Sequence, residues 1–208
     1  MDPPKILGIL IPIFAVLLTL RYCQLIKRGR IKPVLATWLM FCVSVSLSFS
    51  TYVFTKNHSF TGNLGNMVDM FQVWATLIVI LIYQSGRQRR PNFIESFCLI
   101  ASAGIAIFWF FTGQHVVLNL SMQIILILAY GPLFQTLWSA SENTESFQVW
   151  AVIWTVAAGA IFSAWWKQDA LGMVYSGRTI IFVSITLYLI RRVEKRVRKN
   201  LAVRGGVL

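Results

Sequence analysis

The chain has 208 residues, of which 57% are hydrophobic and 12% are charged, and its mean hydropathy is strongly positive. Soluble domains average about 45–50% apolar and about 25% charged residues, so this composition excludes water-soluble enzyme folds, disulfide scaffolds and disordered chains. A net charge of +12 would suggest a nucleic-acid partner for a soluble protein, but here the basic residues lie between long apolar runs. We therefore expect an integral membrane protein in contact with the lipid bilayer, with basic loops beside it and no nucleic-acid partner.

Seven apolar runs are long enough to cross a hydrocarbon core of roughly 30 Å as helices of about 18–25 residues. We predict an all-α fold of seven transmembrane helices with short links. At the links near Gly113 and Lys167, two spans could instead form one bent helix. In chain order the predicted spans are Ile6 to Ile26, Val34 to Phe54, Leu64 to Gln84, Phe93 to Phe111, Val116 to Trp138, Phe147 to Trp166 and Leu171 to Ile190.

Basic residues are concentrated in alternate links, which predicts the orientation because cytoplasmic loops are enriched in Lys and Arg. Fourteen Lys and Arg residues fall in segments 27–32 and 85–92 and after residue 190, whereas the opposite side holds Lys5, Lys56 and Lys167. With seven spans, this asymmetry places the N-terminus outside and the C-terminus in the cytoplasm. The expected location is the plasma membrane.

The first apolar run follows Met1 without a basic segment and without a small-residue cleavage site after it, so we do not expect a removable signal peptide. Cys23, Cys42 and Cys98 lie within or at the ends of spans without paired spacing, which indicates buried thiols. No catalytic, metal-binding or phosphate-binding motif is found, so we predict neither an enzyme nor a cofactor or metal site.

The two halves of the chain share an order of features. A helix with a proline (Pro12 or Pro132) leads through a polar link to a helix with a tryptophan (Trp38 or Trp150), and a third apolar helix follows. This order predicts a first three-helix repeat in residues 1–90, a linker helix in 91–113, a second repeat in 114–192 and a basic cytoplasmic tail in 193–208, all in one membrane domain. Chance similarity between apolar helices is the alternative.

Each group has three helices, an odd number, so the two groups can run parallel only when one extra helix joins them. This gives a 3+1+3 arrangement. Together with the segment Gly131-Pro132-Leu133-Phe134-Gln135, the polar link 142–146 and Trp150, this arrangement resembles the PQ-loop superfamily. That superfamily includes SWEET sugar transporters, the KDEL receptor and, more loosely, PnuC vitamin transporters. The resemblance implies two bundles packed in the order first, third, second around a central cavity, with hinges at Pro12, Pro132 and Gln135.

An ionisable residue inside a span costs roughly 2.5–3.5 kcal/mol at a helix centre, and two such residues, Arg178 and Asp69, are interpreted as the most informative. Arg178 lies in the last span and Asp69 in the third, so they occupy the third helices of both repeats. We predict that they face one another across the cavity. In one interpretation they bind a solute, and in the other they form a structural pair that fixes helix packing.

Further polar residues recur at helical spacing around these two and must face inward, because lipid cannot satisfy their hydrogen bonds. Trp154 lies deep enough in its span to stack on a flat ligand, with core packing as the alternative. Trp38, close to a span end, is expected to anchor the helix at the membrane interface. The predicted solute-binding residues are Arg178, Asp69, Gln72, Asn66, Tyr175, Asn119, Gln123 and Trp154.

We therefore predict a small-solute transporter of SWEET or PQ-loop type that moves a sugar-like or anionic substrate by alternating access. A receptor or sorting protein on the same scaffold is the first alternative, and a membrane partner subunit without transport is the second. Assembly into a homo-oligomer stays open.

Overall fold

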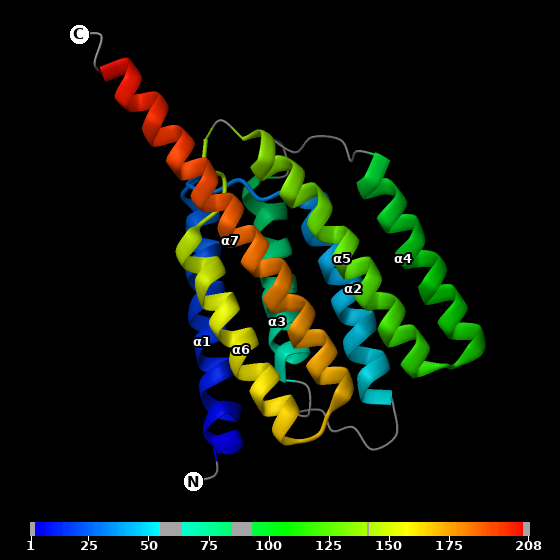
Figure 1. Cartoon of the computed structure of the whole chain (residues 1–208). Helices are drawn as coiled ribbons and strands as arrows, with labels where there is room; N and C mark the ends of the chain where they lie inside the picture. Colours follow the sequence, from blue (N-terminus) through cyan, green and yellow to red (C-terminus); the bar gives the residue numbers. More distant parts are fainter. Residues whose placement is uncertain (1–2, 55–63, 85–92, 141, 206–208) are drawn as a thin grey trace.

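The computed structural model describes residues 3–54, 64–84, 93–140 and 142–205, which form seven α-helices that lie side by side (Figure 1). The predicted all-α fold is confirmed, and all but one of the predicted helix ends lie within three residues of the observed ones. In chain order the helices are α1 (Pro3–Lys27), α2 (Leu35–Phe54), α3 (Leu64–Gln84), α4 (Phe93–Thr112), α5 (His115–Ser139), α6 (Phe147–Trp166) and α7 (Ala170–Gly205).

The last helix end is the one that differs, because α7 continues past Ile190 to Gly205. The predicted end marked the loss of apolar residues, but Arg, Lys and Glu are good helix formers and extend the helix into the basic segment. The two ambiguous links are true turns. Gly113 has a φ of +63° between α4 and α5, and Gln168 has a φ of +55° between α6 and α7, so neither pair of helices is one bent element.

Six described helices, α1 to α3 and α5 to α7, are long and apolar enough to cross a membrane. In α4 the described apolar stretch covers Leu99–Thr112, which is shorter than a full span. The protein is therefore a multi-pass integral membrane protein by helix length and hydropathy, while a seventh span stays a prediction. Large apolar side chains such as Ile13, Leu17 and Ile78 are about half exposed, as expected for surfaces that lipid covers.

Six helices form one bundle, and α4 lies on its outside. α3 packs against both α1 and α2, and α7 packs against both α5 and α6. Contacts between α1 and α6, and between α2 and α5, join the first helix group (α1–α3) to the second (α5–α7). α4 lies against α5 and α2 at the edge of the bundle (Figure 1).

The bundle has two ends, the basic end and the N-terminal end. The basic end carries the α1–α2 link with Lys27, Arg28, Arg30 and Lys32, the α5–α6 link and the extension of α7 (Figure 1). The N-terminal end is the opposite one, where α1 begins and the α6–α7 link lies (Figure 1). The basic segment 85–92 and Lys56 lie outside the described residues, as does the side chain of Lys5.

The core between the groups is rich in aromatic side chains. The expectation that Trp38 anchors the membrane interface is wrong, because this side chain is 5% exposed and packs between Tyr22 and Phe41 with ring centroids 5.4 and 5.9 Å away. Its position near a span end predicted a place at the membrane interface, but Trp38 lies on the face of α2 that points into the bundle. Cys42 is a buried free thiol and Cys23 a half-buried one. The side chain of Cys98 is not among those that the structure describes.

Candidate functional site

A small cavity lies between α2, α3, α5, α6 and α7, where the two helix groups meet. The centre of a water molecule can move over about 40 Å³ within it, which is room for a few ordered waters. Its polar lining consists of Asp69, Gln72, Tyr175, Arg178 and Thr179, and its aromatic lining consists of Trp38, Phe41, Tyr130 and Trp150. Four of the predicted binding residues, Arg178, Asp69, Gln72 and Tyr175, therefore share one cavity.

Arg178 is 8% exposed and is held by several side chains, among them Tyr130, which hydrogen-bonds it. Its Nε donates to Oε1 of Gln123 on α5 at 2.9 Å, and its Nη2 donates to Oγ1 of Thr179 at 3.3 Å. The guanidinium carbon lies 4.8 Å from the centre of the Tyr175 ring, within the range of a cation–π contact. These contacts fix the guanidinium against the cavity wall.

Asp69 on α3 lines the same cavity and is reached from α7 by Tyr175. The Tyr175 hydroxyl donates to Oδ2 of Asp69 at 2.8 Å. Within the described part of the chain, Asp69 and Arg178 form no direct ion pair. The structure thus brings the two predicted charges to one cavity, with the Tyr175 side chain in contact with both.

A second and smaller cavity touches Asp69, Tyr175 and Thr179 from another side and extends to Gly65 and Ser176. It offers about 10 Å³ to the centre of a water molecule, hardly enough for one. Asp69 and Tyr175 therefore border both cavities.

The other predicted amides form a buried network beside the cavity, centred on Ser48 of α2. The Ser48 hydroxyl accepts hydrogen bonds from Nδ2 of Asn66 at 3.0 Å and Nε2 of Gln123 at 3.1 Å. Nδ2 of Asn119 donates to the Ser48 carbonyl at 2.9 Å. Because Gln123 also accepts from Arg178, this network joins α2, α3 and α5 to α7 and holds the arginine in position. Asn66, Asn119 and Gln123 thus support the cavity rather than line it.

Trp154 lies apart from this cavity. It is 39% exposed on α6, and its Nε1 donates to Oγ of Ser184 on α7 at 3.0 Å. The predicted hinge residues also lie outside the cavity lining. Pro12 and Pro132 are inside α1 and α5, which continue as helices through both, and Gln135 is exposed.

At the N-terminal end, a hydrogen bond joins the two helix groups. The hydroxyl of Tyr52 on α2 donates to Oδ2 of Asp169 in the α6–α7 link at 2.6 Å. Oδ1 of Asp169 accepts from the backbone N–H of Gly172 at 3.1 Å, as a helix N-cap does. A Cβ at Gly172 would lie 2.7 Å from Oδ2 of Asp169, so a larger residue there would displace this carboxylate.

At the basic end, a second tyrosine and carboxylate join the same two groups. Oε2 of Glu145 in the α5–α6 link accepts from the hydroxyl of Tyr22 on α1 at 2.9 Å and from Nε1 of Trp150 at 3.1 Å. Glu145 is 5% exposed. Burial raises the pKa of Glu145 from its ordinary value of 4.5 to about 7, and the bonds from Trp150 and Tyr22 offset only part of this effect.

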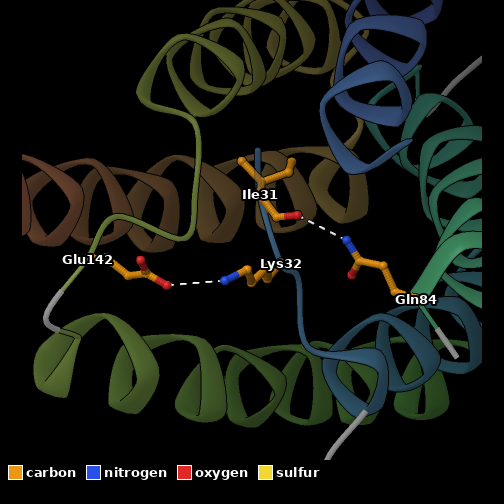
Figure 2. A network of polar contacts seen from close by, with 4 residues as sticks. All are labelled: Ile31, Lys32, Gln84 and Glu142. Carbon is orange, nitrogen blue, oxygen red and sulfur yellow. Dashed lines mark hydrogen bonds and ion pairs between the residues drawn. The ribbon is translucent and has the colours of Figure 1, made fainter. Parts of the chain in front are cut away.

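The α1–α2 link adds further contacts between the helices at the basic end, as Figure 2 shows. Nε2 of Gln84 at the end of α3 donates to the carbonyl of Ile31 at 3.0 Å, and Nζ of Lys32 lies 3.2 Å from Oε1 of Glu142 (Figure 2). The Lys32 N–H also donates to the carbonyl of Thr144 at 3.3 Å. The α1–α2 link is therefore held between α3 and the α5–α6 link.

A wider cavity of about 320 Å³ lies at the basic end, beside Glu145. Its charged lining residues are Arg30, Glu145 and Glu194. Within the described residues, no three His, Cys, Asp or Glu side chains gather as a metal-binding group.

Sequence reasoning missed both tyrosine–carboxylate contacts and Ser48 as a network centre. Tyr22 and Glu145 lie 123 residues apart, and Tyr52 and Asp169 lie 117 apart. No local pattern connects residues at such separations. The available signal was an acidic residue close to the start of the next span in each link, Glu145 before α6 and Asp169 before α7.

The fold and the site define a multi-pass helical membrane protein with a buried polar cavity between two helix groups. Comparison with protein families, curated proteins and solved structures finds no match for this chain.

Proposed function

We propose that this protein is a membrane transporter that moves a small polar solute by alternating access between its two helix groups. The observation that carries the proposal is the pair of charges at the cavity: Arg178 and Asp69 line it together without a direct ion pair. Charged side chains inside the membrane are costly and mark solute pathways. A solute with polar groups would complete the contacts that these two side chains leave open.

The arrangement of the helices supports this function. The third helix of each group packs against the first and the second, in both α1–α3 and α5–α7. Corresponding helices also run in the same direction (Figure 1). Parallel repeats of this kind are common in secondary transporters, with the solute site at the repeat interface, and the packing order is the one that the PQ-loop resemblance implies.

The contacts at the two ends supply what alternating access requires. Tyr22 and Glu145 join the groups at the basic end, and Tyr52 and Asp169 join them at the N-terminal end. Each contact consists of hydrogen bonds between a tyrosine and a link carboxylate, which can break when one end opens. Pro12 and Pro132 lie in the first helices of both groups, where a missing backbone N–H permits bending.

The cavity is too small in this state to hold a solute. Pockets for drug-sized ligands span roughly 300–1,000 Å³, far more than the few waters that fit here. The helix groups must therefore separate to admit a solute.

Uptake into proteoliposomes tests the proposal. The purified protein is reconstituted, and accumulation of radiolabelled sugars, organic acids and amino acids is compared with that in protein-free vesicles. We expect saturable uptake of at least one compound. Binding without accumulation would favour a receptor, and neither binding nor uptake of any compound would favour a partner subunit.

A further inference from the structure

The cavity presents two opposite charges to whatever it binds. Arg178 comes from α7 and Asp69 from α3, so one helix group supplies the positive charge and the other the negative charge. A single anion would satisfy the arginine but would be repelled by an ionised Asp69, and a single cation would meet the reverse problem. The complementary ligand carries both charges.

The separation between the charges is set by one aromatic side chain. The hydroxyl of Tyr175 binds Asp69 while the face of its ring lies against the guanidinium of Arg178. The ligand's two charged groups must therefore be close together, a few bonds apart. This excludes long dipolar molecules.

The arginine is prepared for an oxyanion. A guanidinium has five N–H donors. Arg178 engages its Nε with Gln123 and one Nη2 donor with Thr179, and the Tyr130 side chain also hydrogen-bonds the guanidinium. Its remaining donors suit the two oxygens of a carboxylate, for which arginine offers bidentate geometry.

The walls of the cavity suit an ammonium group. Trp38, Phe41, Tyr130 and Trp150 line it, and Tyr130 lies 5.2 Å from Phe41 and 6.5 Å from Trp150 between ring centroids. A cation over aromatic faces is attracted by their quadrupoles, and the Asp69 carboxyl offers oxygen acceptors to the N–H groups of an ammonium.

We propose that the transported solute is a small zwitterion, with a carboxylate at Arg178 and an ammonium group at Asp69 and the aromatic wall. This inference rests on the proposed function, whose site it specifies. It narrows the sugar-like or anionic substrate that the sequence predicts to the α-amino acid type.

Equilibrium binding of radiolabelled probes to the purified protein tests the inference at two ligand sizes. The zwitterions are alanine and phenylalanine, the anions propionate and phenylpropionate, the cations ethylamine and phenethylamine, and glucose is the neutral probe. We expect one of the zwitterions to bind at least tenfold more tightly than the anion and the cation of its own size. Preference for an anion, a cation or glucose, or binding of none of the probes, would overturn the inference.

Two variants test the assignment of the charges, with thermal unfolding of each to establish that it is folded. Arg178→Gln should shift the preference toward the amine, and Asp69→Asn should shift it toward the carboxylate. Arg21→Gln, which changes an exposed arginine of α1, should keep the wild-type preference. Zwitterion binding that both site variants retain would overturn the inference.

The binding and uptake experiments distinguish failure of the zwitterion site from failure of the proposed transport. Alanine or phenylalanine binding without accumulation in proteoliposomes supports the zwitterion site and contradicts transport. Uptake of glucose or propionate without zwitterion binding supports transport and contradicts the zwitterion site.

Discussion

Replacement of Arg178 by glutamine should strongly reduce solute uptake while the protein stays folded. The substitution removes the guanidinium that lines the cavity but leaves an amide able to hydrogen-bond Gln123. A charge-assisted hydrogen bond contributes about 1.5–3 kcal/mol, so solute affinity should fall roughly 10- to 100-fold. Uptake into proteoliposomes measures the loss, and thermal unfolding in detergent measures the fold.

The fold should tolerate Arg178→Gln because the variant no longer buries a positive charge within a membrane helix. Arg21→Gln is the matched control, since Arg21 is exposed on α1 and should transport as the wild type does. If Arg178→Gln retains wild-type uptake, the arginine is a structural residue and the solute site is misplaced. If Arg178→Gln strongly destabilises the protein but the folded fraction still takes up solute, the arginine also has a structural role.

The second large effect concerns pH and Glu145. Below pH 4.5 its carboxyl is protonated in both the folded and unfolded chains, so the raised pKa leaves stability unaffected. Between 4.5 and about 7 the unfolded chain loses the proton while the folded protein keeps it, so the free energy of unfolding falls as pH rises. The difference between the two pKa values corresponds to about 3 kcal/mol lost by pH 8.

Glu145→Gln should remove this dependence, because an amide keeps an acceptor for Tyr22 and Trp150 but does not ionise. The free energy of unfolding in detergent, measured from pH 4 to pH 8, should therefore be flatter for Glu145→Gln. Glu142→Gln is the control, since Glu142 is exposed and pairs with Lys32 at the surface. A wild-type profile that does not fall between pH 4.5 and 7 would contradict the buried ionisable contact.

The sequence predicted the helices well because each apolar run ends at residues that break helices or favour turns. Segment Leu64–Gln84 and segment Phe147–Trp166 have the predicted ends at both termini. The basic extension of α7 was missed because hydropathy marks where a helix leaves the membrane, not where it ends. Helix propensity favours the continuation to Gly205, and contacts with the end of α5 and the α5–α6 link, such as Asn143 to Glu194, hold its first turns.

The site was predictable in part, for a physical reason. Arg178 and Asp69 could be found because charge inside an apolar span is rare and must face inward. Helical spacing then indicated Gln72 and Tyr175, which lie on the same faces. Pairing between helices was not predictable from spacing, so the partnership of Ser48 with three amides emerges only from the fold.

Trp154 shows the limit of depth as a criterion. Its position within the span is deep, but its face of α6 leads to Ser184 and to the bundle surface. Trp38 shows the converse, since it lies near a span end yet lines the cavity. The rotation of a helix about its axis decides both cases, and tertiary packing fixes that rotation.

The most direct test of alternating access is thiol labelling from each side of the membrane. A single cysteine replaces Val73, which is 6% exposed and lines the cavity, in a variant whose three native cysteines are replaced. A membrane-impermeant thiol reagent is applied to right-side-out and to inverted vesicles. A cysteine at Val183, which is fully buried in the core, is the matched control. Transport by alternating access predicts labelling of the Val73 position from both sides and of the Val183 position from neither; labelling of the Val73 position from one side only, or from neither, would contradict it.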